Sequence, residues 1–152
     1  GGNGFLIHPT DQINQNSLLA ALGNYGGLTP THALLPGSPA INAGISENAP
    51  STDQRGVIRV GAVDSGAFES RGFNLTAIFG NFQSAQLNTV FTNPLIVFVS
   101  SDFGEPVTGG EVIFTPPATG ASAMLAPNPS PNSANNRADV TATAINQTGS
   151  YQ

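Results

Sequence analysis

Five consecutive apolar residues, Leu95-Ile96-Val97-Phe98-Val99, decide the fold class of this chain. A strand buried on both faces carries such an uninterrupted apolar run, and a turn sequence, Asp102-Phe103-Gly104-Glu105-Pro106, follows it. The stretch from Asp139 to Ile145 instead alternates polar and apolar residues, which is typical of a strand with one face in solvent. The sequence therefore predicts an all-β protein in which residues 95–99 form a central strand.

Further strand-like segments occur about every 10 residues from Phe73 onward, separated by Gly, Pro and Asn. This spacing favours a β-sandwich or a barrel. The expected strands are Asn74 to Phe79, Gln86 to Phe91, Leu95 to Ser100, Glu111 to Thr115, Ser122 to Leu125 and Ala138 to Ile145, with another beginning at Ser150. The stretch from Ala126 to Asn136 is predicted to be a loop because Pro, Asn and Ser dominate it.

The first part of the chain, residues 1–71, shows almost no clean alternation and is rich in turn sequences such as Asn24-Tyr25-Gly26-Gly27 and Pro36-Gly37-Ser38-Pro39. Its apolar pieces are too short to form a core unaided. We therefore expect this part to cover the end of a hydrophobic stack, as the terminal units of solenoid proteins do. One short helix is predicted over Asn16 to Leu22, ended by Gly23.

Composition excludes several classes of function. Only 9% of the 152 residues are charged, against about 25% in typical soluble domains, and 18 Gly with 12 Pro leave little room for long helices. The net charge is −5, with no Lys and four scattered Arg, so nucleic acid is not an expected partner. No apolar run is long enough to span a membrane, and Cys is absent. An acidic, Lys-free composition rich in Asn and Thr indicates an extracellular or bacterial cell-surface location.

Three motifs in the first part point to a family. They are Thr29-Pro30-Thr31-His32-Ala33-Leu34-Leu35-Pro36-Gly37-Ser38-Pro39-Ala40-Ile41-Asn42-Ala43-Gly44, Thr52-Asp53-Gln54-Arg55-Gly56 and Asp64-Ser65-Gly66-Ala67-Phe68-Glu69. Together they resemble the pattern near the end of right-handed parallel β-helices in large bacterial surface proteins of the choice-of-anchor Q type. Asn42 replaces the usual Asp of this pattern, and Ser65 replaces a β-branched apolar residue. The resemblance implies that residues 1–71 are the C-terminal cap of a parallel β-helix.

Residues 72–152 resemble a bacterial immunoglobulin-like module of the invasin and intimin kind. The resemblance rests on the stretch from Asp102 to Pro117 and on Gly149-Ser150-Tyr151-Gln152, which is similar to the opening of the penultimate strand of such modules. It implies an incomplete β-sandwich that lacks its last strands. The first residues do not look like a signal peptide, so we expect a piece of a longer polypeptide. The open edge of the sandwich would be completed by the remainder of that polypeptide or by a neighbouring copy.

The carboxylates Asp53, Asp64 and Glu69 and the guanidinium groups of Arg55 and Arg59 form the predicted polar cluster. In a catalytic interpretation, two of the carboxylates would flank a glycosidic bond as acid and base. In a structural interpretation, Arg55 or Arg59 pairs with Asp53 or Asp64 and ties the loops of the cap together. We favour the structural interpretation, because the β-helical enzymes that cleave polysaccharides carry their sites on central coils. We therefore predict that the chain is not an enzyme.

Other candidate sites carry weaker signals. His8 and His32 are 24 positions apart and neither has a second His or a Cys at a metal-ligand spacing. Ser38 lies between prolines in a turn and not in a nucleophile elbow. Asp53, Asp102 and Glu105 could offer oxygen ligands to calcium, but no calcium-binding loop motif is present. No cofactor is predicted, and calcium stays an open alternative.

The predicted function is a structural or adhesive role in a large secreted bacterial cell-surface protein, as part of a stalk, a fibre or a matrix. Its partners would be the rest of the polypeptide or neighbouring copies, together with surface glycans or other cells. Two alternatives remain. The chain could be the non-catalytic end of a β-helical carbohydrate-active enzyme, or a subunit that assembles into filaments by strand exchange.

Overall fold

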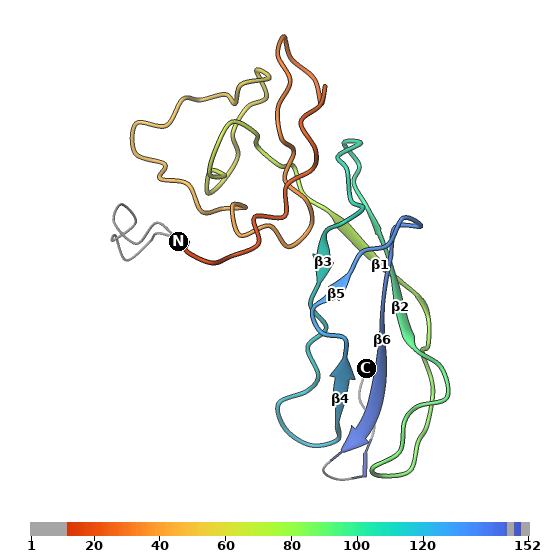
Figure 1. The fold of residues 1–152 in the computed structure, drawn as a ribbon. Helices are drawn as coiled ribbons and strands as arrows, with labels where there is room; N and C mark the ends of the chain where they lie inside the picture. The colour runs from red at the N-terminus through yellow and green to blue at the C-terminus, as the bar shows by residue number, and fades with distance from the viewer. Residues whose placement is uncertain (1–11, 146–147, 150–152) are drawn as a thin grey trace.

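The computed structural model describes residues 12–145 and 148–149, and within them the protein is all-β and contains no helix. Figure 1 shows a loop-rich part beside a group of strands. The strands are β1 (Asn74–Phe79), β2 (Leu95–Ser100), β3 (Glu111–Val112), β4 (Ser122–Ala126), β5 (Ser130–Pro131) and β6 (Arg137–Ile145). The strand predicted to begin at Ser150 lies outside the described residues, as does His8.

The strands form a four-stranded sheet in the order β1-β2-β6-β4 and a two-stranded sheet of β3 and β5, and every pairing is antiparallel. In the larger sheet, Val97 of β2 lies opposite Ala138 of β6. The core of this strand unit, which we define as residues 72–145, consists of buried Val99, Val107, Val112 and Ala138, with Phe73, Val97 and Phe114 packed against them.

The two segments that predicted the fold class behave differently. The alternation of β6 is confirmed, because its second, fourth, sixth and eighth residues are buried while most of the others are exposed. β2 is central, as predicted, since it pairs with both β1 and β6. Its two apolar faces differ in burial: Val99 is fully buried, but Phe98 on the other face is 36% exposed. That face lies beside polar residues of β6, with Phe98 opposite Arg137 and Ile96 opposite Asp139.

The predicted strand bounds are confirmed for β1 and β2 and are correct to one residue for β4 and β6. The strand predicted over Gln86 to Phe91 does not form as such, because Thr89 N–H bonds back to the carbonyl of Gln86 in a turn and Asn88 has a positive φ of 62°. The segment still lies along β6. The N–H groups of Asn88 and Phe91 donate to carbonyls of β6 at 2.8 and 2.9 Å.

Two side chains each hydrogen-bond both backbone groups of a residue in another segment, as a neighbouring strand would. The strand predicted over Glu111 to Thr115 stops at Val112, and beyond it the side-chain amide of Asn128 pairs with both backbone groups of Phe114, at 3.0 and 2.8 Å. Likewise, the Ser130 hydroxyl accepts the N–H of Asp139 and donates to its carbonyl, at 3.0 and 2.8 Å. Ser130 belongs to β5, which forms inside the predicted loop, so that part of the loop prediction is wrong.

The loop unit, which we define as residues 12–71, is held by isolated bridges and turns and contains no strand in its described residues. The helix predicted over Asn16 to Leu22 is wrong. This segment runs antiparallel to residues 31–35, with Leu19 opposite Leu34 and Gly23 opposite Thr31. Packing of apolar residues against a distant segment therefore outweighs local helix propensity. The core contains buried Ala33, Leu34 and Phe68, with Ala20, Tyr25, Ala40 and Ile41 packed around it.

The two units are bonded where they meet. The buried carboxylate of Glu105 accepts the hydroxyl of Ser70 at 2.8 Å and the N–H of Arg71 at 2.9 Å. The N–H of Glu111 donates to the carbonyl of Pro36 at 2.8 Å. Gly37 permits this approach, because it has a φ of 82° and a Cβ there would lie 2.9 Å from the carbonyl oxygen of Glu111. No apolar helix of membrane-spanning length occurs in the described residues.

Candidate functional site

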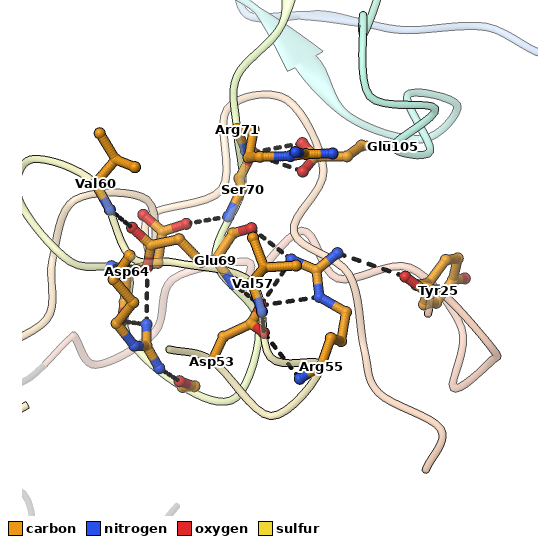
Figure 2. Close-up of polar contacts among 12 residues, drawn as sticks. Tyr25, Asp53, Arg55, Val57, Val60, Asp64, Glu69, Ser70, Arg71 and Glu105 are labelled. Carbon is orange, nitrogen blue, oxygen red and sulfur yellow. Dashed lines mark hydrogen bonds and ion pairs between the residues drawn. The ribbon is translucent and has the colours of Figure 1, made fainter. Parts of the chain in front are cut away.

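The polar cluster forms one hydrogen-bond network inside the loop unit, as Figure 2 shows. The carboxylate of Asp53 organises one half of it. Its Oδ1 accepts the N–H groups of Arg55 at 2.8 Å and Val57 at 3.0 Å. Its Oδ2 accepts the N–H of Glu69 at 2.9 Å and the Nε of Arg55 at 2.8 Å. The side chain of Asp53, which is 0% exposed, thus holds its own turn and also the backbone of Glu69, 16 residues away.

The side chain of Arg55 contacts a carboxylate, backbone carbonyls and an aromatic ring at the same time. Besides its ion pair with Asp53 at 2.7 Å, its guanidinium donates to the carbonyls of Glu69 at 2.6 Å and Tyr25 at 3.5 Å. The guanidinium carbon lies 3.4 Å from the centre of the Phe68 ring, an attractive cation–π arrangement. Tyr25 meets the same ring edge-on, with centroids 6.2 Å apart. The arginine therefore joins the ion pair to the apolar core of the loop unit.

The second half of the cluster is built on Glu69 and Asp64. Oε2 of Glu69 accepts Arg59 Nη1 at 2.8 Å and the N–H of Asp64 at 3.0 Å, and Oε1 accepts the N–H of Val60 at 3.2 Å. The two oxygens of Asp64 accept the N–H groups of Asn42 at 2.7 Å and Ser70 at 2.6 Å. Arg59 also donates to two backbone carbonyls, at 3.2 and 2.8 Å. Three loops are thereby tied to one another.

The environment shifts two pKa values in opposite directions. Burial raises the pKa of Asp53, but hydrogen bonds from the N–H of Glu69 and from the Arg55 side chain, followed by further N–H donors, outweigh it. The pKa of Asp53 therefore lies below its ordinary value of 3.8. Burial also raises the pKa of Asp64, and here the two N–H donors do not offset it, while the nearby negative charge of Glu69 adds to the increase.

The structure brings all five predicted residues together and decides their pairing. Arg55 pairs with Asp53, one of the two partners expected for it, whereas Arg59 pairs with Glu69. Asp64 has backbone N–H groups as its partners instead of a guanidinium. The three carboxylate residues are only 6%, 4% and 2% exposed. Such an arrangement fixes loops, and its acceptor atoms are already occupied by donors of the same chain.

Sequence reasoning missed two contributors. Glu105 was considered only as a calcium ligand, yet it bonds the strand unit to the loop unit through Ser70 and Arg71. Phe68 lies under Arg55 as the centre of the loop-unit core. A Glu directly before Pro106 in a short turn sequence was the available signal for the first. The residues around Phe68 gave no comparable signal of its contact with Arg55.

The remaining candidates are structurally engaged or isolated. Nδ1 of His32 lies 2.8 Å from the carbonyl oxygen of Ala20. The Ser38 hydroxyl donates to the carbonyl of Ser17 at 2.7 Å within a turn. Asp102 is exposed and does not join Asp53 or Glu105, each of which has its own partners. Among residues 12–145 and 148–149, no group of three or more His, Asp or Glu side chains could hold a metal ion.

Comparison with known proteins gives no relative, because no family model, no curated protein and no solved structure matches the chain.

Proposed function

We propose that this protein is a structural connector in a large secreted bacterial cell-surface protein, in which a β-helix cap is joined to an immunoglobulin-like module. The observation that carries the proposal is the use of buried charge. Asp53, Arg55, Arg59, Asp64 and Glu69 all bond to the protein itself, and Glu105 extends this bonding across the junction. Such a connector transmits orientation from one unit to the next in a stalk or a fibre.

The strand order supports the immunoglobulin-like part of the proposal. In that fold one sheet has the order A-B-E-D, and the other contains C, F and G. If β1 and β2 are strands A and B, and β4 and β6 are D and E, then the order β1-β2-β6-β4 agrees with the first sheet. β3 then takes the place of strand C, with β5 as its partner. Strands F and G have no counterpart among the described residues.

The contacts of the carboxylates speak against the enzymatic alternative. A glycosidase needs two carboxyl groups that reach the scissile bond from either side. Asp53, Asp64 and Glu69 are each at least nine-tenths buried, and their oxygens accept backbone N–H groups or a guanidinium. A substrate oxygen would have to displace these donors, and every displaced buried donor would cost about 1 to 3 kcal/mol.

Two measurements test the proposal. Antibodies raised against the protein should label intact, unpermeabilised cells of the source organism, and absence of labelling on cells that express the protein would contradict the surface location. Incubation of the protein with a panel of polysaccharides should release no new reducing ends. Release that disappears in an Asp64→Asn variant with an unchanged melting temperature would instead establish a glycosidase.

A further inference from the structure

A groove lies where the loop unit meets the strand unit, and its lining is mostly apolar. It contains residues from both units: Val60, Arg71, Phe73, Leu75, Phe103 and Ile113. Val60, Leu75 and Ile113 are 71%, 58% and 72% exposed, which is unusual for three aliphatic side chains at one place. The groove is therefore a candidate interaction surface, and the charges along it indicate what it accepts.

Arg71 is the unpaired cation of this groove. Its guanidinium carbon lies 3.7 Å from the centre of the Phe103 ring, and among the described residues no carboxylate lies within ion-pair distance of it. Arg55 has the same placement over Phe68, but its N–H groups are used by Asp53 and by two carbonyls. Both arginines thus stack on an aromatic ring, but within residues 12–145 and 148–149 only Arg71 of the two has side-chain nitrogens that no acceptor uses.

The position of Arg71 is fixed before any partner arrives. Its N–H donates to Glu105, whose other oxygen accepts the Ser70 hydroxyl, so the backbone is held while the ring of Phe103 supports the side chain. A planar guanidinium held in this way presents a two-pronged donor that matches a carboxylate. A carboxylate is therefore the expected polar feature of the partner.

The rest of the groove excludes a polyanion. Glu111 also lines it, and the whole chain carries a net charge of −5, so a partner with many negative charges would be repelled. β1 is exposed along its whole length, and among the described residues its only hydrogen-bonded neighbour strand is β2. Such an edge offers its free backbone groups to an extended chain. An acidic polysaccharide carries many negative charges, and it has no peptide backbone that could pair with this edge.

We propose that this groove binds an extended protein segment with apolar side chains at alternate positions and a single carboxylate that pairs with Arg71. The apolar side chains contact Leu75, Phe73 and Ile113, while the backbone of the segment adds to the free edge of β1. The inference deepens the proposed connector function, because it identifies the chemistry of the segment that joins the module.

The test uses short synthetic peptides that alternate Val and Thr and carry one Glu, whose position is moved along the set. Matched peptides carry Gln instead of Glu. Binding to the full 152-residue chain is measured by calorimetry, and the contacted residues by NMR shift changes. We expect the best Glu peptide to bind about tenfold more tightly than its Gln match, the effect of a hydrogen bond to a charged group. Signals of Leu75 and Ile113 should shift.

Two variants test whether Arg71 causes the difference in affinity between the Glu and Gln peptides. Arg71→Gln keeps the backbone N–H that Glu105 accepts, so the fold should persist, and it should abolish the difference between the Glu and Gln peptides. Arg137→Gln removes an exposed arginine of the same charge on β6, where it does not line the groove, and should leave the difference intact. Equal melting temperatures of the two variants would establish that folding does not explain the result.

Three outcomes would overturn the inference. They are the failure of all peptides to bind, equal affinity of Glu and Gln peptides for the unsubstituted protein, and tighter binding of a galacturonate oligomer than of any Glu peptide. None of these results depends on cell-surface labelling or on polysaccharide cleavage. The inference and the proposed function can therefore fail separately.

Discussion

In the loop unit, buried carboxylates join the backbone carbonyls as acceptors of N–H groups, whereas in the strand unit the N–H groups donate mostly to carbonyls of neighbouring strands. Asp53 accepts three such N–H groups, and Asp64 and Glu69 accept two each. The strand unit instead distributes its bonding over three antiparallel pairings in one sheet. The loop unit therefore depends on a few residues, each of which holds several loops, and the strand unit depends on many residues that each do little.

The largest loss of stability should follow from Asp53→Asn, because Asp53 accepts more hydrogen bonds than any other carboxylate of the cluster. The substitution leaves the guanidinium of Arg55 buried without its counter-charge, and the loss of one partner of a buried pair costs about 3 to 5 kcal/mol. Urea unfolding of the loop unit, followed by the fluorescence of Tyr25 in a Tyr151→Phe background, measures the loss. The exposed Asp102→Asn is the control and should change stability by less than about 0.5 kcal/mol. Equal effects of the two substitutions would contradict the role of Asp53.

The strand unit should respond less to its own most damaging small change. Val140→Ala removes two methyl groups at a fully buried position of β6, and we expect a loss of about 2 to 3 kcal/mol. Amide hydrogen exchange in β2 and β6 measures it. Val90→Ala, at a side chain that is 59% exposed, is the matched control and should be nearly silent. If Val140→Ala unfolded the loop unit first, the division into two units would be wrong.

The junction between the units should show a smaller effect. Glu105→Gln places an NH₂ group against one of two donors, the Ser70 hydroxyl or the Arg71 N–H, and should cost about 1 to 2 kcal/mol. The expected signature is a wider separation between the unfolding midpoints of the two units. NMR relaxation should also show that the rotational correlation times of the two units differ more than in the unsubstituted chain. Unchanged midpoints and relaxation would mean that Glu105 does not couple the units.

The smallest effect is the pH dependence inside the polar cluster, because two carboxyl groups act in opposite directions. The lowered pKa of Asp53 contributes stability above pH 3.8 that is lost as pH falls through its folded-state pKa. The raised pKa of Asp64 contributes stability that is full below pH 3.8 and is lost as pH rises through its folded-state pKa. An NMR titration of the carboxyl carbons should place the two on opposite sides of 3.8. Titration of both on the same side would contradict the contacts described.

The strand unit could largely be predicted from sequence because its periodicity is local. β1 and β2 carry the apolar and β-branched residues that strands favour, and their bounds were predicted to the residue. β5 was missed because a two-residue strand that follows Pro129 and itself contains Pro131 shows no alternation. The segment over Asn16 to Leu22 has apolar spacing compatible with a helix, but its partners are residues 31–35, which local propensity cannot include.

The polar cluster could be predicted only in part, for a related reason. Asp53 and Arg55 are two residues apart, so their pairing follows from one turn. The pairing of Arg59 with Glu69 requires two loops to meet, and the sequence between them does not determine that they do. Glu105 is more distant still, since its partners lie 34 and 35 positions away. Predictability thus declines with the separation of the partners along the chain.

The side chains of Asn128 and Ser130 limit where a further strand can be added to the protein. They occupy the backbone groups of Phe114 and Asp139, so no foreign strand can pair at these two places, whereas among the described residues β1 and β4 each pair with a neighbouring strand on one side only. Strand addition is therefore blocked beside Phe114, which follows β3 of the smaller sheet, and beside Asp139 of β6, while β1 and β4 are the two edges of the larger sheet at which a strand can be added. An incoming strand would consequently be directed to the outer edges of the larger sheet and kept away from Phe114 and Asp139.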